Sequence, residues 1–226
     1  MTSRRTLVFS ALCLLSASAL AADPKWIEGQ HYFRLQPPVP VNVPAGKVEV
    51  TEIFSYGCPA CNRFAPFMRS LKRSLPANAV VDYVPASWNT AEAWPMFQRA
   101  YLTAVKMGVA DRAHDAVYDS IWKNGELAVA DSSGRVKAKL PTIEDAARFY
   151  AKTTGVEASQ FVATAKSFAV EVDIKRAEDR IVAVKADQTP TIVVNGKYRS
   201  HPPAAGGDAQ LVELVKWLVA RESGAK

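Results

Sequence analysis

Apolar residues near the start of this chain recur with the period of a β-strand. In residues 47–54 they alternate with polar residues, as expected for a strand with two distinct faces. One face would carry Val48, Val50, Glu52 and Phe54. The pattern therefore places one carboxylate on an otherwise apolar face. Shorter strands are expected at residues 31–35 and 79–84.

Residues 58–75 change to the spacing of an amphipathic helix. The apolar positions of this helix are Phe64, Phe67, Met68, Leu71 and Leu75. Pro59 suits the first helical turn, because proline has no amide hydrogen to leave unpaired. Pro66 is expected to kink the helix rather than to end it.

Residues 87–177 show helical spacing only. Two apolar stripes are expected, made of Phe97, Tyr101, Ala104, Val105 and Gly108 and of Phe161, Ala165, Phe168 and Val172. Thr142 and Asp145 have the spacing of a capping box and predict the start of another helix. A polar loop at residues 130–139 interrupts this block.

Strand character returns at residues 189–198, where Asn195 and Gly196 form a strong two-residue hairpin signal. A last helix is expected from Asp208. Its inward positions are Leu211, Leu214, Val215 and Leu218. The order strand, strand, helix, strand, helical block, strand, strand, helix predicts an α/β fold with inserted helices.

The first 21 residues have the layout of a cleaved secretory signal. Arg4 and Arg5 precede an apolar run of about 14 residues, which is shorter than the roughly 20 needed to span a bilayer. Cleavage is expected near Ala21 or Ala22, and Cys13 leaves with the signal.

Charge and composition exclude little beyond nucleic-acid binding. The net charge is +6, the signal contributes two of the basic residues, and no block of five or more like charges occurs. We therefore expect no nucleic-acid partner. The remaining residues, about 205, can bury a core in one domain that carries an insertion.

Without Cys13, only Cys58 and Cys61 remain, two residues apart. A disulfide in so short a loop constrains the unfolded chain little, because the stabilisation grows with loop length. A reactive pair is therefore favoured over a structural disulfide. At a helix N-terminus, unpaired amides and the helix dipole favour a thiolate on the first cysteine, while the second lies one turn deeper. We expect Cys58 to be the reactive sulfur and Cys61 its buried partner.

A zinc site is one alternative interpretation of such a pair. No second pair follows, and His31, His114 and His201 are isolated in the sequence, so no metal is expected. A structural disulfide also stays open. The five tryptophans are assigned to the core.

The segment FSYGCPACNRF, with Glu52 six residues before Cys58, and the later TPTIVVNGKY resemble the active-site and hairpin segments of the DsbA family. The resemblance extends from IEGQHYFRL through EAWPMFQRAYLTAVKMGV to the C-terminal helix. It implies a thioredoxin fold with an inserted all-helical domain. Residues 22–86 and 178–226 would form the thioredoxin-like domain, and residues 87–177 the helical insertion.

The same resemblance implies a periplasmic thiol–disulfide oxidoreductase that donates the Cys58–Cys61 disulfide to reduced, unfolded exported proteins. A DsbB-like membrane quinone reductase would reoxidise the pair. No cofactor other than this disulfide would be needed, and the protein is expected to be a monomer.

Five further residues are implicated by their places in the matching segments. Pro59 and Ala60 lie between the cysteines and would support the pair. Pro190 matches the cis-proline of the family, and the backbone of Thr189 would pair with an extended substrate peptide. Glu52 matches a buried acid that takes up or relays the proton of the second cysteine. An edge-strand proline and a solvated carboxylate remain the plainer alternatives.

Three positions depart from the family pattern. The best-known members have His where this chain has Ala60, Val where it has Thr189, and a lysine where it has Asp82. Because Ala60 supplies no charge to the thiolate, a weaker oxidant is expected, and a reductase or isomerase of the same fold is the alternative. Asp82 would raise a carboxyl pKa if it pointed toward Glu52. A thiolate metal-binding module is the remaining alternative.

Overall fold

The computed structural model describes residues 25–224, so the expected signal lies outside the described residues. In this part of the chain a five-stranded sheet has the order β1-β5-β4-β2-β3. The strands are β1 (Phe33–Arg34), β2 (Val48–Phe54), β3 (Ala79–Pro85), β4 (Thr191–Val194) and β5 (Tyr198–Ser200). β2 and β3 are parallel, and the other neighbours are antiparallel.

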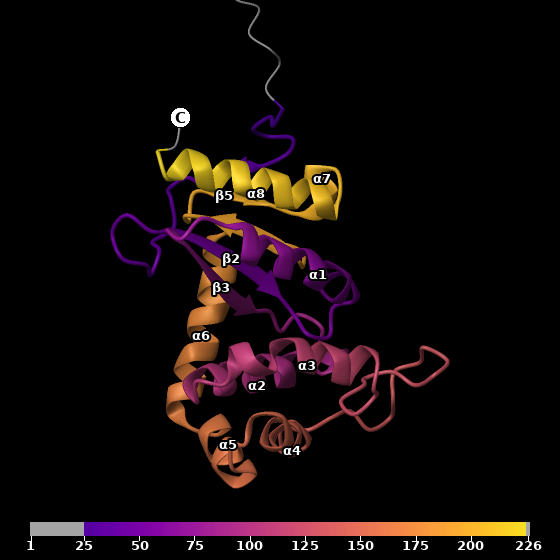
Figure 1. Cartoon of the computed structure of the whole chain (residues 1–226). Coiled ribbons are helices and arrows are strands. Elements are labelled where there is room, and N and C mark those ends of the chain that lie inside the picture. The colour runs from indigo at the N-terminus through magenta and orange to yellow at the C-terminus, as the bar shows by residue number, and fades with distance from the viewer. Residues whose placement is uncertain (1–24, 225–226) are drawn as a thin grey trace, which may run out of the picture.

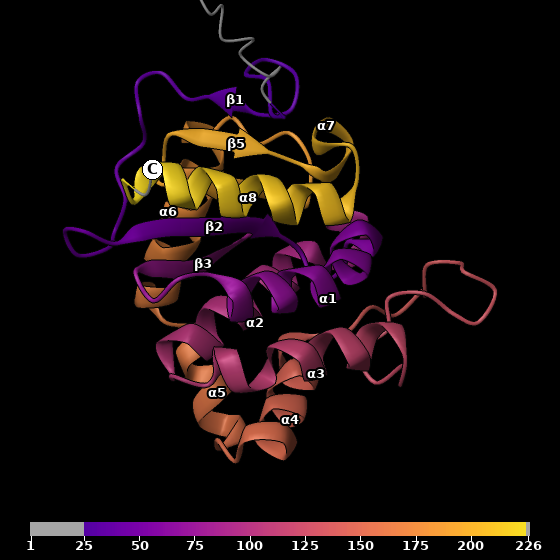
Figure 2. The same cartoon turned by 45° about the horizontal axis from the view of Figure 1, so that its top comes forward.

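Helices cover both faces of this sheet. α1 (Pro59–Ser74) and α8 (Asp208–Glu222) lie on one face, and α6 (Phe168–Ala183) crosses behind the other (Figures 1 and 2). All seven residues of β2 are buried. The alternating pattern of this strand therefore reflects two different buried environments rather than a buried and a solvated face.

The inserted helices pack beside the β3 edge of the sheet (Figure 1). They are the short 3₁₀ helix η1 (Thr90–Glu92), α2 (Trp94–Lys106), α3 (Ala110–Trp122), α4 (Ile143–Thr154) and α5 (Ala158–Ala165). This arrangement is the expected thioredoxin fold with inserted helices. The expected domain boundary after residue 177 falls inside α6, which continues from the insertion into the layer behind the sheet, and the domain bounds stay a prediction.

Two local signals in the sequence form the expected structures. Thr142 and Asp145 make a complete capping box at the start of α4. Asn195 and Gly196 both have positive φ in the hairpin between β4 and β5. A side chain at Gly196 would collide with the carbonyl of Val39, because a Cβ there would lie 1.9 Å from that oxygen. Only glycine fits this turn.

Several expectations about the helices are wrong. The stripe from Phe161 to Val172 belongs to two helices, since α5 ends at Ala165 and α6 begins at Phe168, whose side chain is 82% exposed. Ser167 caps the new helix through the amide of Val170, which breaks the periodicity. Exposure also removes Val105 and Gly108 from the first stripe, and Trp88 and Trp217 from the core. A short helix, α7 (Pro202–Ala205), was not expected.

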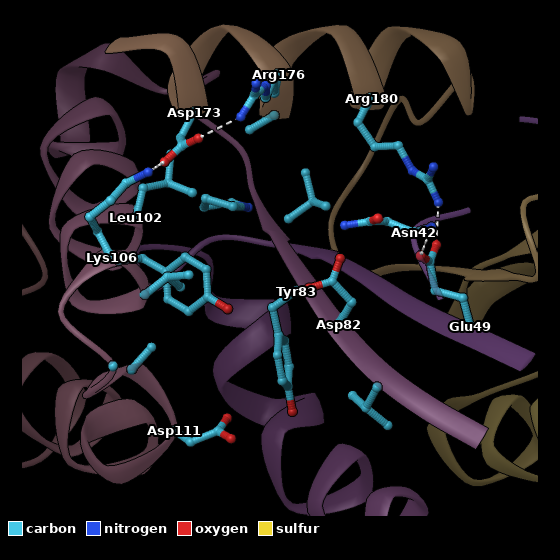
Figure 3. A pocket seen from close by; sticks show the side chains of 18 residues that line it. Asn42, Glu49, Asp82, Tyr83, Leu102, Lys106, Asp111, Asp173, Arg176 and Arg180 are labelled. Atoms are coloured by element: carbon cyan, nitrogen blue, oxygen red, sulfur yellow. Dashed lines mark hydrogen bonds and ion pairs between the residues drawn. The ribbon is translucent and has the colours of Figure 1, made fainter. Parts of the chain in front are cut away.

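A buried ion pair ties α6 to β2. Arg180 of α6 pairs with Glu49 of β2, whose side chain is only 3% exposed (Figure 3). Glu49 also accepts hydrogen bonds from the amide of Asn42 and the hydroxyl of Thr51, at 3.0 and 2.9 Å. Arg180 donates in addition to the carbonyl of Pro40. Every oxygen of this buried carboxylate is therefore paired.

We expect Arg180→Ala to lower the free energy of unfolding by about 3 kcal/mol, because it leaves the Glu49 carboxylate buried without its counter-ion. Urea denaturation of the reduced protein measures this change. Lys175→Ala is the matched control on the same helix, because its ion pair with Asp179 is solvent-exposed and should contribute less than about 1 kcal/mol. Equal losses in the two variants would contradict the role given to the buried pair.

Candidate functional site

The two cysteines lie where β2 passes through a short turn into α1. Residues 55–57 form this turn, and the amide of Cys58 donates to the carbonyl of Ser55 at 3.1 Å. Cys58 is the N-cap residue of α1, with extended backbone, and Pro59 is at the first helical position. The sequence specifies this helix start locally, because proline fits the first turn and the residue before proline favours an extended conformation.

The Cys58 sulfur is surrounded by hydrogen-bonding groups. The amide of Cys61 donates to it at 3.4 Å, and the sulfur lies 3.5 Å from the carbonyl oxygen of Thr189. The pKa of Cys58 is lowered to about 6, most of all by the side chain of Cys61 and further by Thr189 and the amides of Cys61 and Ala60, against the opposing effect of burial. Cys58 is therefore largely a thiolate at neutral pH.

Cys61 has the opposite environment. Its side chain is fully buried, at 0% exposure. Burial raises the pKa of Cys61 well above its ordinary value, and the nearby Cys58 and Glu52 raise it further. The pair is therefore asymmetric, with an anionic sulfur at the surface end and a protonated thiol below it.

Glu52 lies beneath this pair with no partner for one of its oxygens. The residue is 2% exposed, and Oε1 has no hydrogen-bond partner in the described part of the chain. Burial first, and the charge of Cys58 second, raise the pKa of Glu52 to about 8. The carboxyl group is therefore mostly protonated at neutral pH, and the alternative of a solvated carboxylate is wrong.

Asp82 does not face Glu52. In the parallel pairing of β2 with β3, Asp82 is opposite Thr51, and Tyr83 is opposite Glu52. Figure 3 shows Asp82 and Tyr83 pointing to opposite sides of β3. Asp82 lines a groove of about 750 Å³ between β3, α2 and α6, and neither cysteine lines that groove. Asp82 is therefore not among the groups that raise the pKa of Glu52.

The later loop brings Thr189 and Pro190 to the cysteines from far along the chain. The Thr189–Pro190 peptide bond is cis. β4 begins only at Thr191, so the backbone of Thr189 lies outside the strand pairing. Between the cysteines, Pro59 is exposed and Ala60 is partly buried. The structure thus places the other six site residues named from the sequence near Cys58.

Residues 25–224 contain no group of three or more His, Cys, Asp and Glu side chains arranged to hold a metal ion. Across the same span, no helix has the length and apolar character to cross a bilayer.

Sequence reasoning missed the residues that fix the turn before Cys58. Tyr56 is 1% exposed, and its hydroxyl lies 2.9 Å from Nδ1 of His114. Trp122 donates from Nε1 to the Tyr56 carbonyl, also at 2.9 Å. Both partners belong to α3, more than fifty positions away. No local spacing signals such contacts, which depend on how the insertion docks.

Paired cysteines at the start of α1, a cis-proline loop against the first sulfur and this strand order together define a thiol–disulfide oxidoreductase of the thioredoxin class. A family model described as thioredoxin matches residues 43–213, most of the chain.

Similarity to known proteins shows which family of this class the chain belongs to. The thiol:disulfide interchange protein DsbA of Pseudomonas aeruginosa is 34% identical over 223 residues, 98% of each chain. DsbA of Azotobacter vinelandii is 32% identical over 218 residues, 96% of this chain and 94% of that one. The solved structure of DsbA from Xylella fastidiosa matches with a TM-score of 0.78 at 31% identity, covering 89% of this chain and 100% of that one. The chain belongs to the DsbA family of thiol:disulfide interchange proteins, within the thioredoxin family.

The unpaired acid gives a prediction about stability and pH. Because the pKa of Glu52 is raised from 4.5 to about 8, the folded protein retains a proton that the unfolded chain releases in this window. The contribution of Glu52 to stability therefore falls as the pH rises from about 4.5 to 8. We expect Glu52→Gln to flatten this fall and to raise the free energy of unfolding at pH 8 by roughly 1–3 kcal/mol.

Urea denaturation of the reduced protein at pH 5 and pH 8 measures both effects. Glu49→Gln is the matched control, since Glu49 is equally buried but fully hydrogen-bonded, and it should destabilise the protein at both pH values. A Glu52→Gln protein that keeps the wild-type pH dependence would refute the raised pKa.

The Cys58 environment gives a second prediction. Because the side chain of Cys61 makes the largest contribution to the lowered pKa, Cys61→Ala should raise the pKa of Cys58 above about 6. Cys61→Ser keeps a hydrogen-bond donor and should stay closer to the wild type. Thiolate absorbance near 240 nm against pH gives the midpoint, and Cys58→Ala should abolish the transition. A midpoint that is the same in Cys61→Ala and the wild type would contradict this assignment.

Proposed function

We propose that Cys58 is the exchanging sulfur and that the protein donates the Cys58–Cys61 disulfide to newly exported proteins. A substrate thiolate attacks the sulfur of Cys58, the Cys58–Cys61 bond breaks, and Cys61 leaves and takes up a proton. A second substrate thiolate then attacks the substrate sulfur of the mixed disulfide. A disulfide forms in the substrate, and Cys58 departs as a thiolate. Two electrons pass to the cysteine pair.

The lowered pKa of Cys58 is the observation that carries this proposal. A thiolate stabilised in the reduced protein drives the reaction toward reduction of its own disulfide. After allowance for solvent screening, a pKa of about 6 contributes on the order of 1 kcal/mol at pH 7, or roughly 20 mV. This contribution favours donation of the disulfide without fixing the full potential.

The raised pKa of Cys61 supports the same direction. A protonated thiol is a poor nucleophile. Cys61 is therefore slow to attack Cys58 in the mixed disulfide, a reaction that would re-form the Cys58–Cys61 bond and release the substrate without oxidising it. Glu52, mostly protonated beneath Cys61, can exchange a proton with it when the bridge opens or closes. The proposed role of Glu52 is thus to hold the proton that Cys61 gains and loses.

The proposed substrates are reduced, unfolded polypeptides in the periplasm, which the chain would reach through its N-terminal signal. The backbone of Thr189, which no strand pairing occupies, would hydrogen-bond to the extended substrate. Pro59 and Ala60 would border the substrate at the cysteines, and Pro190 would contact it from the opposite side. A DsbB-like membrane quinone reductase would reoxidise the pair, and the protein would act as a monomer.

A reductase or isomerase of the same fold is the second candidate. Ala60 favours it, because the side chain between the cysteines carries no charge to stabilise the thiolate. Such an enzyme would need electrons from a membrane donor. A metal-binding module is less favoured, because two thiolates alone leave a zinc ion with half of its usual ligands.

The reduction potential of the pair, measured by equilibration with glutathione, separates these functions. We expect a value well above about −270 mV, the potential of thioredoxin, and rapid oxidation of a reduced, unfolded substrate. A value at or below that of thioredoxin would overturn the direction proposed.

Cys58→Ser should abolish substrate oxidation, whereas Lys175→Ala, an exposed change on α6, should leave it unchanged. Retained oxidation by Cys58→Ser would refute the nucleophile. Stoichiometric zinc bound tightly by the reduced protein would favour the metal-binding alternative.

A further inference from the structure

The turn between β2 and α1 is held by side chains from the inserted helices. We use the name Tyr56 clamp for Tyr56 with its two partners on α3, His114 and Trp122. His114 meets the Tyr56 hydroxyl and Trp122 donates to the Tyr56 carbonyl, each at 2.9 Å. The backbone and the side chain of one residue are thus both bound to the same helix.

The peptide group between Tyr56 and Gly57 is fixed at both ends. Its carbonyl accepts from Trp122, and its amide donates to the Ser55 hydroxyl at 3.2 Å. Trp94 of α2 packs against Gly57 from the insertion. A Cβ on Gly57 would lie 2.7 Å from two atoms of the Trp94 indole, so only glycine leaves room for this ring. This peptide group cannot rotate without weakening one of these two hydrogen bonds.

Packing makes the clamp rigid. The His114 ring lies 4.6 Å from the Tyr83 ring and 5.5 Å from the Phe54 ring, between centroids. Tyr118 meets the Tyr56 ring edge to face at 5.0 Å. Aromatic pairs at these separations add to the energy of burial. Tyr56 is therefore set in a cluster contributed by the sheet and by α3.

The position of Cys58 depends on this peptide group, which is its immediate neighbour. The Cys61 amide donates to the Cys58 sulfur at 3.4 Å, and the carbonyl oxygen of Thr189 lies 3.5 Å from the same sulfur. Hydrogen bonds weaken steeply as their geometry departs from the preferred one. A small rotation of the turn would therefore weaken the hydrogen bond by which the Cys61 amide holds the sulfur.

We propose that Tyr56, His114 and Trp122 are positioning residues for the disulfide exchange, holding the turn so that the Cys58 sulfur stays on the amides of the α1 N-terminus. The inserted helices are then part of the redox machinery and set the oxidising strength of the pair. This inference rests on the proposal that Cys58 is the exchanging sulfur. It assigns no direct contact with substrate to any of the three residues.

Two substitutions remove one clamp hydrogen bond each and keep an aromatic ring. Trp122→Phe deletes the donor to the Tyr56 carbonyl, and Tyr56→Phe deletes the hydroxyl that meets His114. We expect each to raise the titration midpoint of Cys58 by about half a pH unit or more. The equilibrium constant for reduction by glutathione should fall about three- to tenfold, because a less stabilised thiolate makes a weaker oxidant.

The controls make the same chemical changes away from the turn. Trp217→Phe alters a partly exposed residue of α8, and Tyr32→Phe alters a buried ring near β1. Both should keep the wild-type midpoint and equilibrium constant. Urea denaturation of the oxidised and reduced forms completes the test, because a merely structural residue would destabilise both forms equally and leave their difference unchanged.

Wild-type midpoints and equilibrium constants in the folded Trp122→Phe and Tyr56→Phe proteins would overturn the inference. If Trp122→Phe does not fold, Tyr56→Phe decides, because it removes a single oxygen atom and keeps the ring. The result is separable from the proposed function. The clamp fails alone if its variants match the wild type while Cys58→Ser abolishes exchange, and the proposed function fails if Cys58→Ser remains active.

Discussion

The hydrogen bond from the Cys61 amide to the Cys58 sulfur joins the fold of this protein to its chemistry. It exists because Cys58 occupies the N-cap position of α1, where helix amides have no partners within the helix. A sulfur in that position is stabilised as an anion, and in the proposed exchange that anion is the leaving group. The strand before the helix, the loop at Thr189 and the burial of Cys61 all act by placing this sulfur or by setting the contrast with its partner.

The two buried acids of β2 have different surroundings and different roles. Glu49 faces α6, where Arg180 and backbone groups pair its oxygens. Glu52 faces α1 and lies beneath the cysteines with an unpaired oxygen. The first acid is a charged structural contact. The second is held in its neutral form at a cost in stability, which is typical of groups that take part in proton transfer.

The inserted helices supply the part of the active site that a thioredoxin core alone would lack. They contribute Trp94, His114 and Trp122 to the turn before Cys58. Tryptophan has no charge, and burial lowers the pKa of His114 to about 4, so His114 is neutral at pH 7. The effect proposed for them on the sulfur is therefore geometric rather than electrostatic. Such placement matters more in a chain that has Ala60 between its cysteines. Because Ala60 has no charge to stabilise the thiolate, the stabilisation depends on the amides around the sulfur.

Local sequence determined the alternating strand, the helix start at Pro59, the capping box at Thr142 and the hairpin at Gly196, because each depends on residues a few positions apart. The cysteine spacing and the DsbA resemblance likewise predicted which pair is reactive. Tertiary structure alone decided that Asp82 turns away from Glu52, since a strand register is a property of two strands. It also decided which side chains reach Tyr56, because contacts between residues more than fifty positions apart follow from how the inserted helices pack against the sheet.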